Sequence, residues 1–207
     1  MPDSERAITD LAALVHAADL IVVARVAADG TSRLVVQPDQ TPPAVPPPPP
    51  QGLGDDKSRL AAQQPPAVTP TRQSPAQVAS SGTTGLPVTD FPVEVERVVR
   101  GAGAVSGARI TVIQPGGSVK VPIFPGGPAR ARRVQIEDDS LMSPGERYVL
   151  FLRAAEAGAF RVVGGAQGRL TVDAQDRVHP LHPGIPPTRG HDGQTLSGFL
   201  TDVAAIT

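Results

Sequence analysis

A run of prolines interrupts the chain between two stretches that have the pattern of β-strands. The segment PPAVPPPPP, residues 42–50, excludes helix and sheet because proline has a fixed φ and no N–H, and it predicts polyproline II. Half of the 24 prolines lie between Pro38 and Pro75, in a stretch too poor in apolar residues to offset its ordering entropy. We therefore expect residues 37–85 to be a disordered insertion, and residues 1–36 and 86–207 to form a single domain.

Alternating segments on both sides of this insertion predict a mainly β fold. In FPVEVERVVRG, residues 91–101, Val93 and Val95 alternate with Glu94 and Glu96, which is the period of a strand with one polar face. Turn residues recur about every eight to twelve positions, which favours a closed or partly open antiparallel barrel, or a sandwich, over βαβ units. The other predicted strands are LIVVARV (20–26), SRLVVQ (32–37), ARITVIQ (108–114), VKVPIF (119–124), RARRVQIED (130–138), ERYVLFLRA (146–154), AFRVV (159–163), GRLTV (168–172) and RVHPL (177–181).

Local signals refine three of these elements. SRLVVQ is expected to pair back on LIVVARV as a hairpin across ADGT, and Pro122 confines VKVPIF to an edge or a bulge. Apolar residues at helical spacing predict a short helix at each end of the chain. The first spans Glu5 to Ala17, with Asp3 or Ser4 as N-cap, and the second spans residues 195–206, with Asp192 or Thr195 as cap.

Composition narrows the classes of function. A net charge of −1 provides no global field to attract nucleic acid or an anionic membrane, and an aromatic share of 3% leaves few stacking platforms. The chain has no cysteine, which excludes disulfides, thiolate catalysis and cysteine-ligated metals. No signal peptide is visible and the longest apolar run is too short to span a bilayer, so the chain as read is cytoplasmic. Export or attachment to the cell envelope is the alternative.

The order of several motifs resembles the netrin-like, or tissue-inhibitor-of-metalloproteinase-like, β-barrel group. The motifs are ADLIVVARV, a strand ending in VVRG, and GERYVLF; the matching positions are Ala18, Asp19, Val26, Val98, Arg100, Gly101, Gly145, Glu146, Arg147, Tyr148 and Phe151. A GGxQGRxxV segment, Gly164–Val172, is similar to uncharacterised bacterial proteins. The resemblance implies an OB-like barrel acting as a binding module. The inhibitors of that group chelate zinc through an N-terminal cysteine, so that mechanism does not carry over to this chain.

Aromatic and basic side chains supply the candidate binding residues. Tyr148 and Arg147 either line a groove, or Tyr148 packs in the barrel with its hydroxyl at the rim while Arg147 is solvated. Arg130, Arg132 and Arg133 cluster in one strand, where Arg130 and Arg132 point to the same face. This cluster is either a nucleic-acid contact or the charged guard of a sheet edge.

Histidines near the C-terminus supply the candidate metal ligands. His179, His182, His191 and Asp192 offer three imidazoles and a carboxylate, a donor set that suits zinc or nickel. Two further segments have simpler interpretations. The acidic run 137–139 is expected to be a solvated turn, and the glycines of GGAQGR are expected to form a turn or bulge between two strands.

These observations lead to one functional expectation with two alternatives. The first is a non-enzymatic binding or interaction module, with a protein partner and the proline-rich segment as spacer. The second is a metal-binding protein or metal-dependent enzyme that uses the C-terminal histidines. The third is a nucleic-acid-binding barrel centred on residues 130–133. The sequence itself requires no cofactor, names no ligand and leaves the oligomeric state open.

Overall fold

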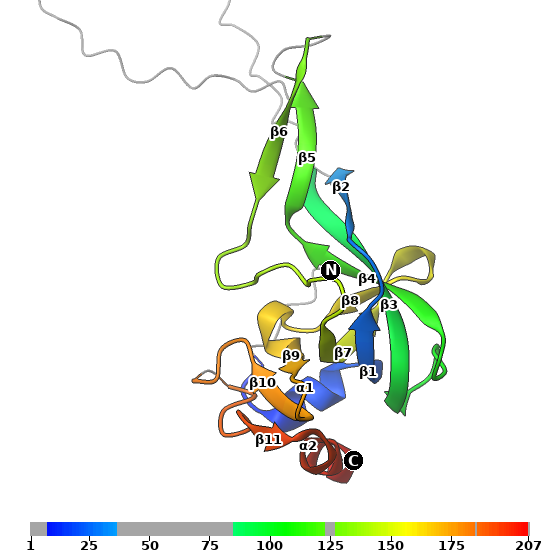
Figure 1. Ribbon diagram of the computed structural model, residues 1–207, viewed down its shortest axis with the longest axis vertical. Helices are drawn as coiled ribbons and strands as arrows, with labels where there is room; N and C mark the ends of the chain where they lie inside the picture. The colour runs from blue at the N-terminus through cyan, green and yellow to red at the C-terminus, as the bar shows by residue number, and fades with distance from the viewer. Residues whose placement is uncertain (1–7, 37–84, 123–126, 185, 207) are drawn as a thin grey trace, which may run out of the picture.

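The structure is a computed structural model, and it describes residues 8–36, 85–122, 127–184 and 186–206 (Figure 1). The predicted insertion lies outside the described residues, apart from its last position. The elements are α1 (Leu11–Ala17), β1 (Leu20–Val26), β2 (Thr31–Val36), β3 (Gly85–Gly101), β4 (Arg109–Pro115), β5 (Gly117–Pro122), β6 (Ala129–Val134), β7 (Arg147–Ala154), η1 (Glu156–Gly158), β8 (Phe160–Val162), η2 (Gly165–Gly168), β9 (Arg169–Val172), β10 (Arg177–Pro180), β11 (Gln194–Thr195) and α2 (Leu196–Ala205).

Five strands close into a barrel in the order β1-β3-β4-β8-β7, with β7 pairing back on β1. Numbered within the barrel, this order is 1-2-3-5-4, as in an OB fold, so the predicted OB-like barrel is confirmed. One detail differs from an all-antiparallel barrel: β4 and β8 run parallel, with Val112 opposite Phe160. Strands β9, β10 and β11 extend the sheet beyond β7.

The pairing of β2 differs from the predicted hairpin. β2 pairs with the first part of β3, Thr31 standing opposite Asp90, and it does not pair with β1. The predicted hairpin is wrong because both edges of β1 are already taken, one by β3 and the other by β7. The 17-residue β3 therefore joins two regions: its first half carries β2 and its second half closes the barrel.

Two apolar clusters lie on opposite faces of β1 and β7, which explains why both strands are nearly continuous apolar runs. The first fills the barrel and includes Leu20, Val22, Val93, Val112, Leu150 and Leu152. The second lies between the sheet and the two helices, and it includes Ile21, Val23, Val149, Phe151, Leu14, Phe199 and Val203. Figure 1 shows α1 and α2 together at the lower end of the barrel.

Caps explain where the two helices begin. The Asp10 carboxylate accepts a hydrogen bond from the backbone N–H of Ala13 at 2.7 Å, so α1 begins at Leu11 and not at Glu5. The predicted caps Asp3 and Ser4 lie outside the described residues. At the other end, the Thr195 hydroxyl accepts from the N–H of Gly198 at 3.3 Å, which confirms Thr195 as the cap of α2.

Strands β5 and β6 form a separate two-stranded ribbon, which we call the arm. The arm comprises Gly117–Pro122 and Ala129–Val134, and it projects away from the barrel toward the top of Figure 1. Pro122 is the last described residue of β5 and stands opposite Ala129. β2 lies beside the arm, and the backbone N–H of Ser118 donates to the Ser32 hydroxyl at 3.1 Å.

Candidate functional site

A buried polar cluster lies where β4 and β9 meet the loop before β7. At its centre is Arg169, of which 2% is exposed. Its guanidinium donates to Asp139 Oδ1 at 2.9 Å, to Gln114 Oε1 at 3.2 Å and to the carbonyl of Ser140. The guanidinium also lies 5.5 Å from the centroid of the Tyr148 ring, which provides a cation–π contact.

The members of this cluster satisfy one another. The Gln114 amide donates to Asp139 at 2.9 Å, and its oxygen accepts from the N–H of Met142 at 3.1 Å. Burial raises the pKa of the Asp139 carboxyl, although the Arg169 guanidinium acts in the opposite direction, and burial also lowers the pKa of Arg169. These hydrogen bonds therefore hold the loop before β7 against the barrel, and we assign the cluster a structural role.

The GGAQGR segment positions Arg169, and sequence reasoning missed this role. As predicted, its glycines form a turn, the 3₁₀ segment η2, and Gly168 lies so close to the chain that a Cβ would stand 2.0 Å from the Val163 carbonyl oxygen. The turn delivers Arg169 into the interior. The acidic run was expected to be solvated, but Asp139 is 8% exposed because it pairs with Arg169. The one available signal was an arginine and an aspartate both flanked by turn residues, which is weak.

Tyr148 and Arg147 do not form a common groove. Tyr148 is 3% exposed and packs in the barrel, its hydroxyl donating to the Glu146 carboxylate, and burial raises the pKa of this phenol above its usual value. Arg147 points outward and pairs with Glu96 at 2.9 Å and with Asp176 at 2.8 Å. Of the two interpretations left open by the sequence, the packed Tyr148 agrees with this geometry. The solvated Arg147 that accompanied it does not, because this side chain is 22% exposed and held in two ion pairs.

The three histidines among the predicted metal ligands contact different partners. His179 lies between two carboxylates, its Nδ1 2.8 Å from Asp192 and its Nε2 3.0 Å from Asp173. Both its ring nitrogens are thus engaged, and the neighbouring carboxylates raise the pKa of His179, Asp173 most. His182 Nε2 faces the Asp138 carbonyl at 2.5 Å.

His191 completes this picture. Its ring packs against Phe199 with centroids 5.3 Å apart, and its Nδ1 lies 2.7 Å from Gln194 Oε1. Only His179 and Asp192 of the four predicted ligands therefore come together. Within the described ranges, no group of three or more His, Cys, Asp or Glu side chains is arranged to hold a metal ion. This geometry lends no support to a site that combines the four.

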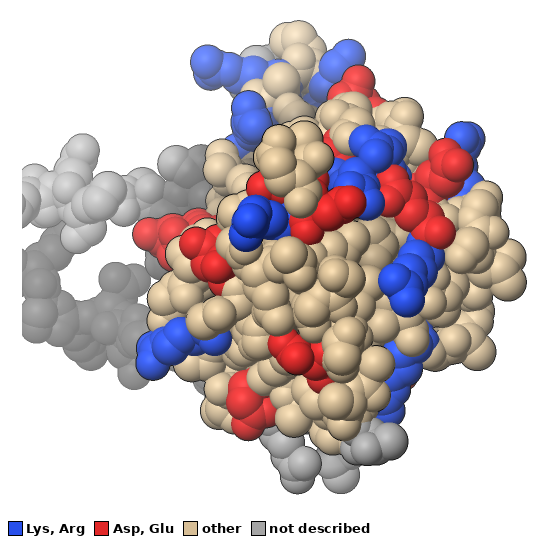
Figure 2. All heavy atoms as spheres, turned by 60° about the horizontal axis from the view of Figure 1, so that its bottom comes forward, with Lys and Arg blue, Asp and Glu red and all other residues tan. Residues whose placement is uncertain are grey.

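The arm carries Arg130, Arg132 and Arg133, all exposed, on β6. Lys120 on β5 adds a fourth cation, and residues 117–134 contain no Asp or Glu. Elsewhere the charges are mixed: Figure 2 shows basic and acidic side chains beside one another on the lower face. An example on the barrel is the chain of ion pairs in which Glu96 binds both Arg25 and Arg147. The arm is therefore a place where one sign of charge gathers.

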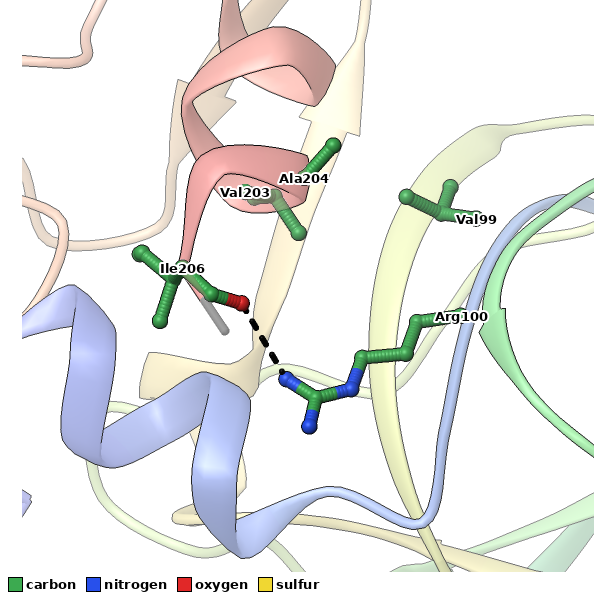
Figure 3. Close-up of a pocket in the computed structure, with 5 residues that line it drawn as sticks. All are labelled: Val99, Arg100, Val203, Ala204 and Ile206. Atoms are coloured by element: carbon green, nitrogen blue, oxygen red, sulfur yellow. Dashed lines mark hydrogen bonds between the residues drawn. The ribbon is translucent and has the colours of Figure 1, made fainter.

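A small cleft lies between the end of β3 and α2. It has a volume of about 250 Å³ and is lined by Val99, Arg100, Val203, Ala204 and Ile206. Figure 3 shows the Arg100 guanidinium reaching across it to the Ile206 carbonyl, at 3.4 Å. Ligand sites for small molecules are usually larger and more enclosed. The cleft offers one cation and little else that could act on a substrate.

Comparison of the chain with protein-family models, with curated proteins and with solved structures gives no match. The netrin-like resemblance therefore stays a prediction, and we infer function from the geometry described above. In the part of the chain that the structure describes, no helix has both the length and the apolar character needed to cross a membrane.

Proposed function

We propose that the protein is a non-enzymatic binding module whose arm contacts a protein partner, with the proline-rich segment between β2 and β3 as a spacer. The observation that carries this proposal is the arm itself. It extends beyond the barrel, its β6 strand is exposed from Ala129 to Arg133, and its charges are all positive. A projecting ribbon of this kind contributes little to a core and is well placed to meet another molecule.

The rest of the molecule has the character of a rigid support. The barrel is filled by apolar side chains, and Arg169, Asp139 and Gln114 use their polar groups on one another. A closed barrel has few open edges, so an exposed strand outside it is the natural place for contact. Function of this type requires a stable scaffold and a presented surface, which are the two features found here.

Shortening the arm tests the proposal. Replacing residues 119–132 by Asn-Gly joins Ser118 to Arg133, which are opposite one another, through a two-residue hairpin turn. We expect the variant to keep its thermal unfolding temperature and to lose partners that the intact protein captures in quantitative cross-linking. An unchanged set of partners would contradict the proposal. A control that alters charge but keeps the arm is Arg97→Gln, at an exposed position on the barrel.

Replacing residues 38–84 by Gly-Ser-Gly-Ser tests the spacer. Shortening this connection roughly tenfold lowers the entropic cost of closing it by about 2 kcal/mol, so the variant should unfold at the same or a higher temperature. Calorimetry measures this directly. A large loss of thermal stability would show that the segment contributes to the fold, and the spacer role would then be abandoned.

A further inference from the structure

Among the described residues, no strand pairs with the outer edge of β6. β6 pairs with β5, and the Ser118 N–H of β5 donates to the Ser32 hydroxyl of β2. An exposed strand edge presents unpaired N–H and C=O groups that can accept an added strand. The strand that binds there is selected by the backbone groups that point outward and by the side chains beside them.

The direction of the Ser118 N–H identifies the outward groups. This N–H donates to Ser32, on the side of β5 away from β6. In an antiparallel pair, opposite residues exchange both their hydrogen bonds or neither. Arg133 stands opposite Ser118, so its N–H and C=O also point away from the partner strand, as do those of Ala131 and Ala129 two and four positions earlier. Pro122, which has no N–H, stands opposite Ala129 and fits this pattern.

The side chains along this edge favour a negatively charged partner strand. Arg130 and Arg132 project to one face of the ribbon and Arg133 to the other, because successive strand residues alternate. Ala129 and Ala131, whose backbone groups point outward, have small side chains that leave the edge accessible. A strand added at about 4.8 Å would place its own side chains opposite these arginines. Carboxylates two residues apart would match Arg130 and Arg132.

We propose that the edge of β6 binds an extended acidic segment of a partner protein as an added β-strand. This inference rests on the proposed function and names the class of partner. Outward backbone groups at residues 129, 131 and 133 provide the ladder, and Arg130 and Arg132 select alternate Asp or Glu side chains. The backbone hydrogen bonds supply affinity that does not depend on the partner's sequence, and the arginine charges supply the preference for acidic segments.

Two other occupants fit less well. A second copy of β6 would bring two rows of arginines together, and like charges directly opposite are destabilising. A nucleic acid would satisfy the charges but cannot continue a backbone ladder.

The test uses a labelled peptide of about ten residues with alternating Thr and Glu, blocked at both ends, and fluorescence anisotropy at ~0.15 M salt. A Thr-Lys peptide of equal length is the control probe. Ala131→Pro removes an outward N–H from an edge strand, where proline is tolerated, while Ala131→Ser keeps it. Arg130→Gln with Arg132→Gln removes the selecting charges, and Arg97→Gln with Arg109→Gln removes two exposed charges from the barrel.

We expect the Thr-Glu peptide to bind the full-length protein. Its affinity should fall about tenfold or more with Ala131→Pro and with the Arg130/Arg132 pair, and stay unchanged with both controls. Weakening by the arginine pair but not by Ala131→Pro would overturn the added strand and leave a simple charge patch. Tighter binding of an equally long oligo-dT would favour nucleic acid instead. A dimer that Ala131→Pro abolishes would identify a second copy as the occupant.

Failure of this inference is distinguishable from failure of the proposed function. If no acidic peptide binds but arm-shortened protein still loses its cross-linked partners, the arm is a contact surface of another kind. If arm shortening changes nothing, the proposed function fails as well.

Discussion

Breaking the buried pair between Arg169 and Asp139 should be the most destabilising change among the polar residues of the barrel. In Asp139→Ala the guanidinium, 2% exposed, loses its charged partner in a place that water does not reach. Removing one partner of a buried pair costs about 3–5 kcal/mol. For a domain of this size each kcal/mol lowers the unfolding temperature by about 2–4 °C, so the expected decrease is about 6–20 °C.

A double-mutant cycle separates the pair from its surroundings. Arg169→Met leaves Asp139 buried, but burial already raises the pKa of this carboxyl, and losing the cation raises it further and favours the neutral form. We therefore expect Arg169→Met to cost less than Asp139→Ala. The double variant should recover about 0.5–3 kcal/mol relative to the sum of the two, which is the coupling expected of residues in contact. The Gln114 amide remains in both variants and limits the recovery.

Urea unfolding followed by circular dichroism and by tyrosine fluorescence measures these free energies. The chain has one Tyr and no Trp, and Tyr148 lies beside Arg169, so its emission reports on the cluster. Glu96→Ala is the control, because it removes a partly exposed carboxylate whose ion pairs contribute about 1 kcal/mol or less each. An Asp139→Ala protein within about 1 kcal/mol of the parent, or a strictly additive cycle, would refute the structural role of the cluster.

Two further changes test the fold and its charges. Gly101→Ala should destabilise the protein by several kcal/mol, because Gly101 has a φ of +95° and an added Cβ would stand 2.0 Å from the Asp19 carbonyl oxygen. Thermal unfolding measures this loss of stability. A variant as stable as the parent would contradict this close approach of the two backbones. His179 has a raised pKa because Asp173 and Asp192 favour its charged form, so its stabilisation is complete below the unfolded value of about 6.5 and is lost as pH rises through the folded pKa. The difference in unfolding temperature between the parent and His179→Gln should therefore be largest near pH 5–6 and shrink above the folded pKa, and an NMR titration midpoint below about 6.5 would contradict this.

Local sequence patterns predicted many of the strands and a helix cap. The alternation of Val93 and Val95 with glutamates predicted β3, and the apolar run at 147–154 predicted β7, because burial on one face or on both leaves a periodic trace in the sequence. The cap of α2 was predicted as Asp192 or Thr195, and the structure selects Thr195, whose hydroxyl reaches an N–H three residues away, which is a local contact. Arg130, Arg132 and Arg133 were recognised as a basic strand for the same reason.

Pairing and burial were decided by tertiary structure. Tertiary contacts decide that β2 lies beside β3 and that β4 runs parallel to β8. They also decide that His179, His182 and His191 contact different partners. Arg169 shows the limit most clearly. From the sequence alone, an arginine is expected at the surface. Its burial becomes favourable only because the fold places Asp139 and Gln114, which are distant in sequence, within hydrogen-bonding distance of it. The sequence by itself determined which segments are strands and where their charges stand; the closed barrel decided which of those charges are buried, paired or presented, because these outcomes depend on long-range contacts that no local pattern records.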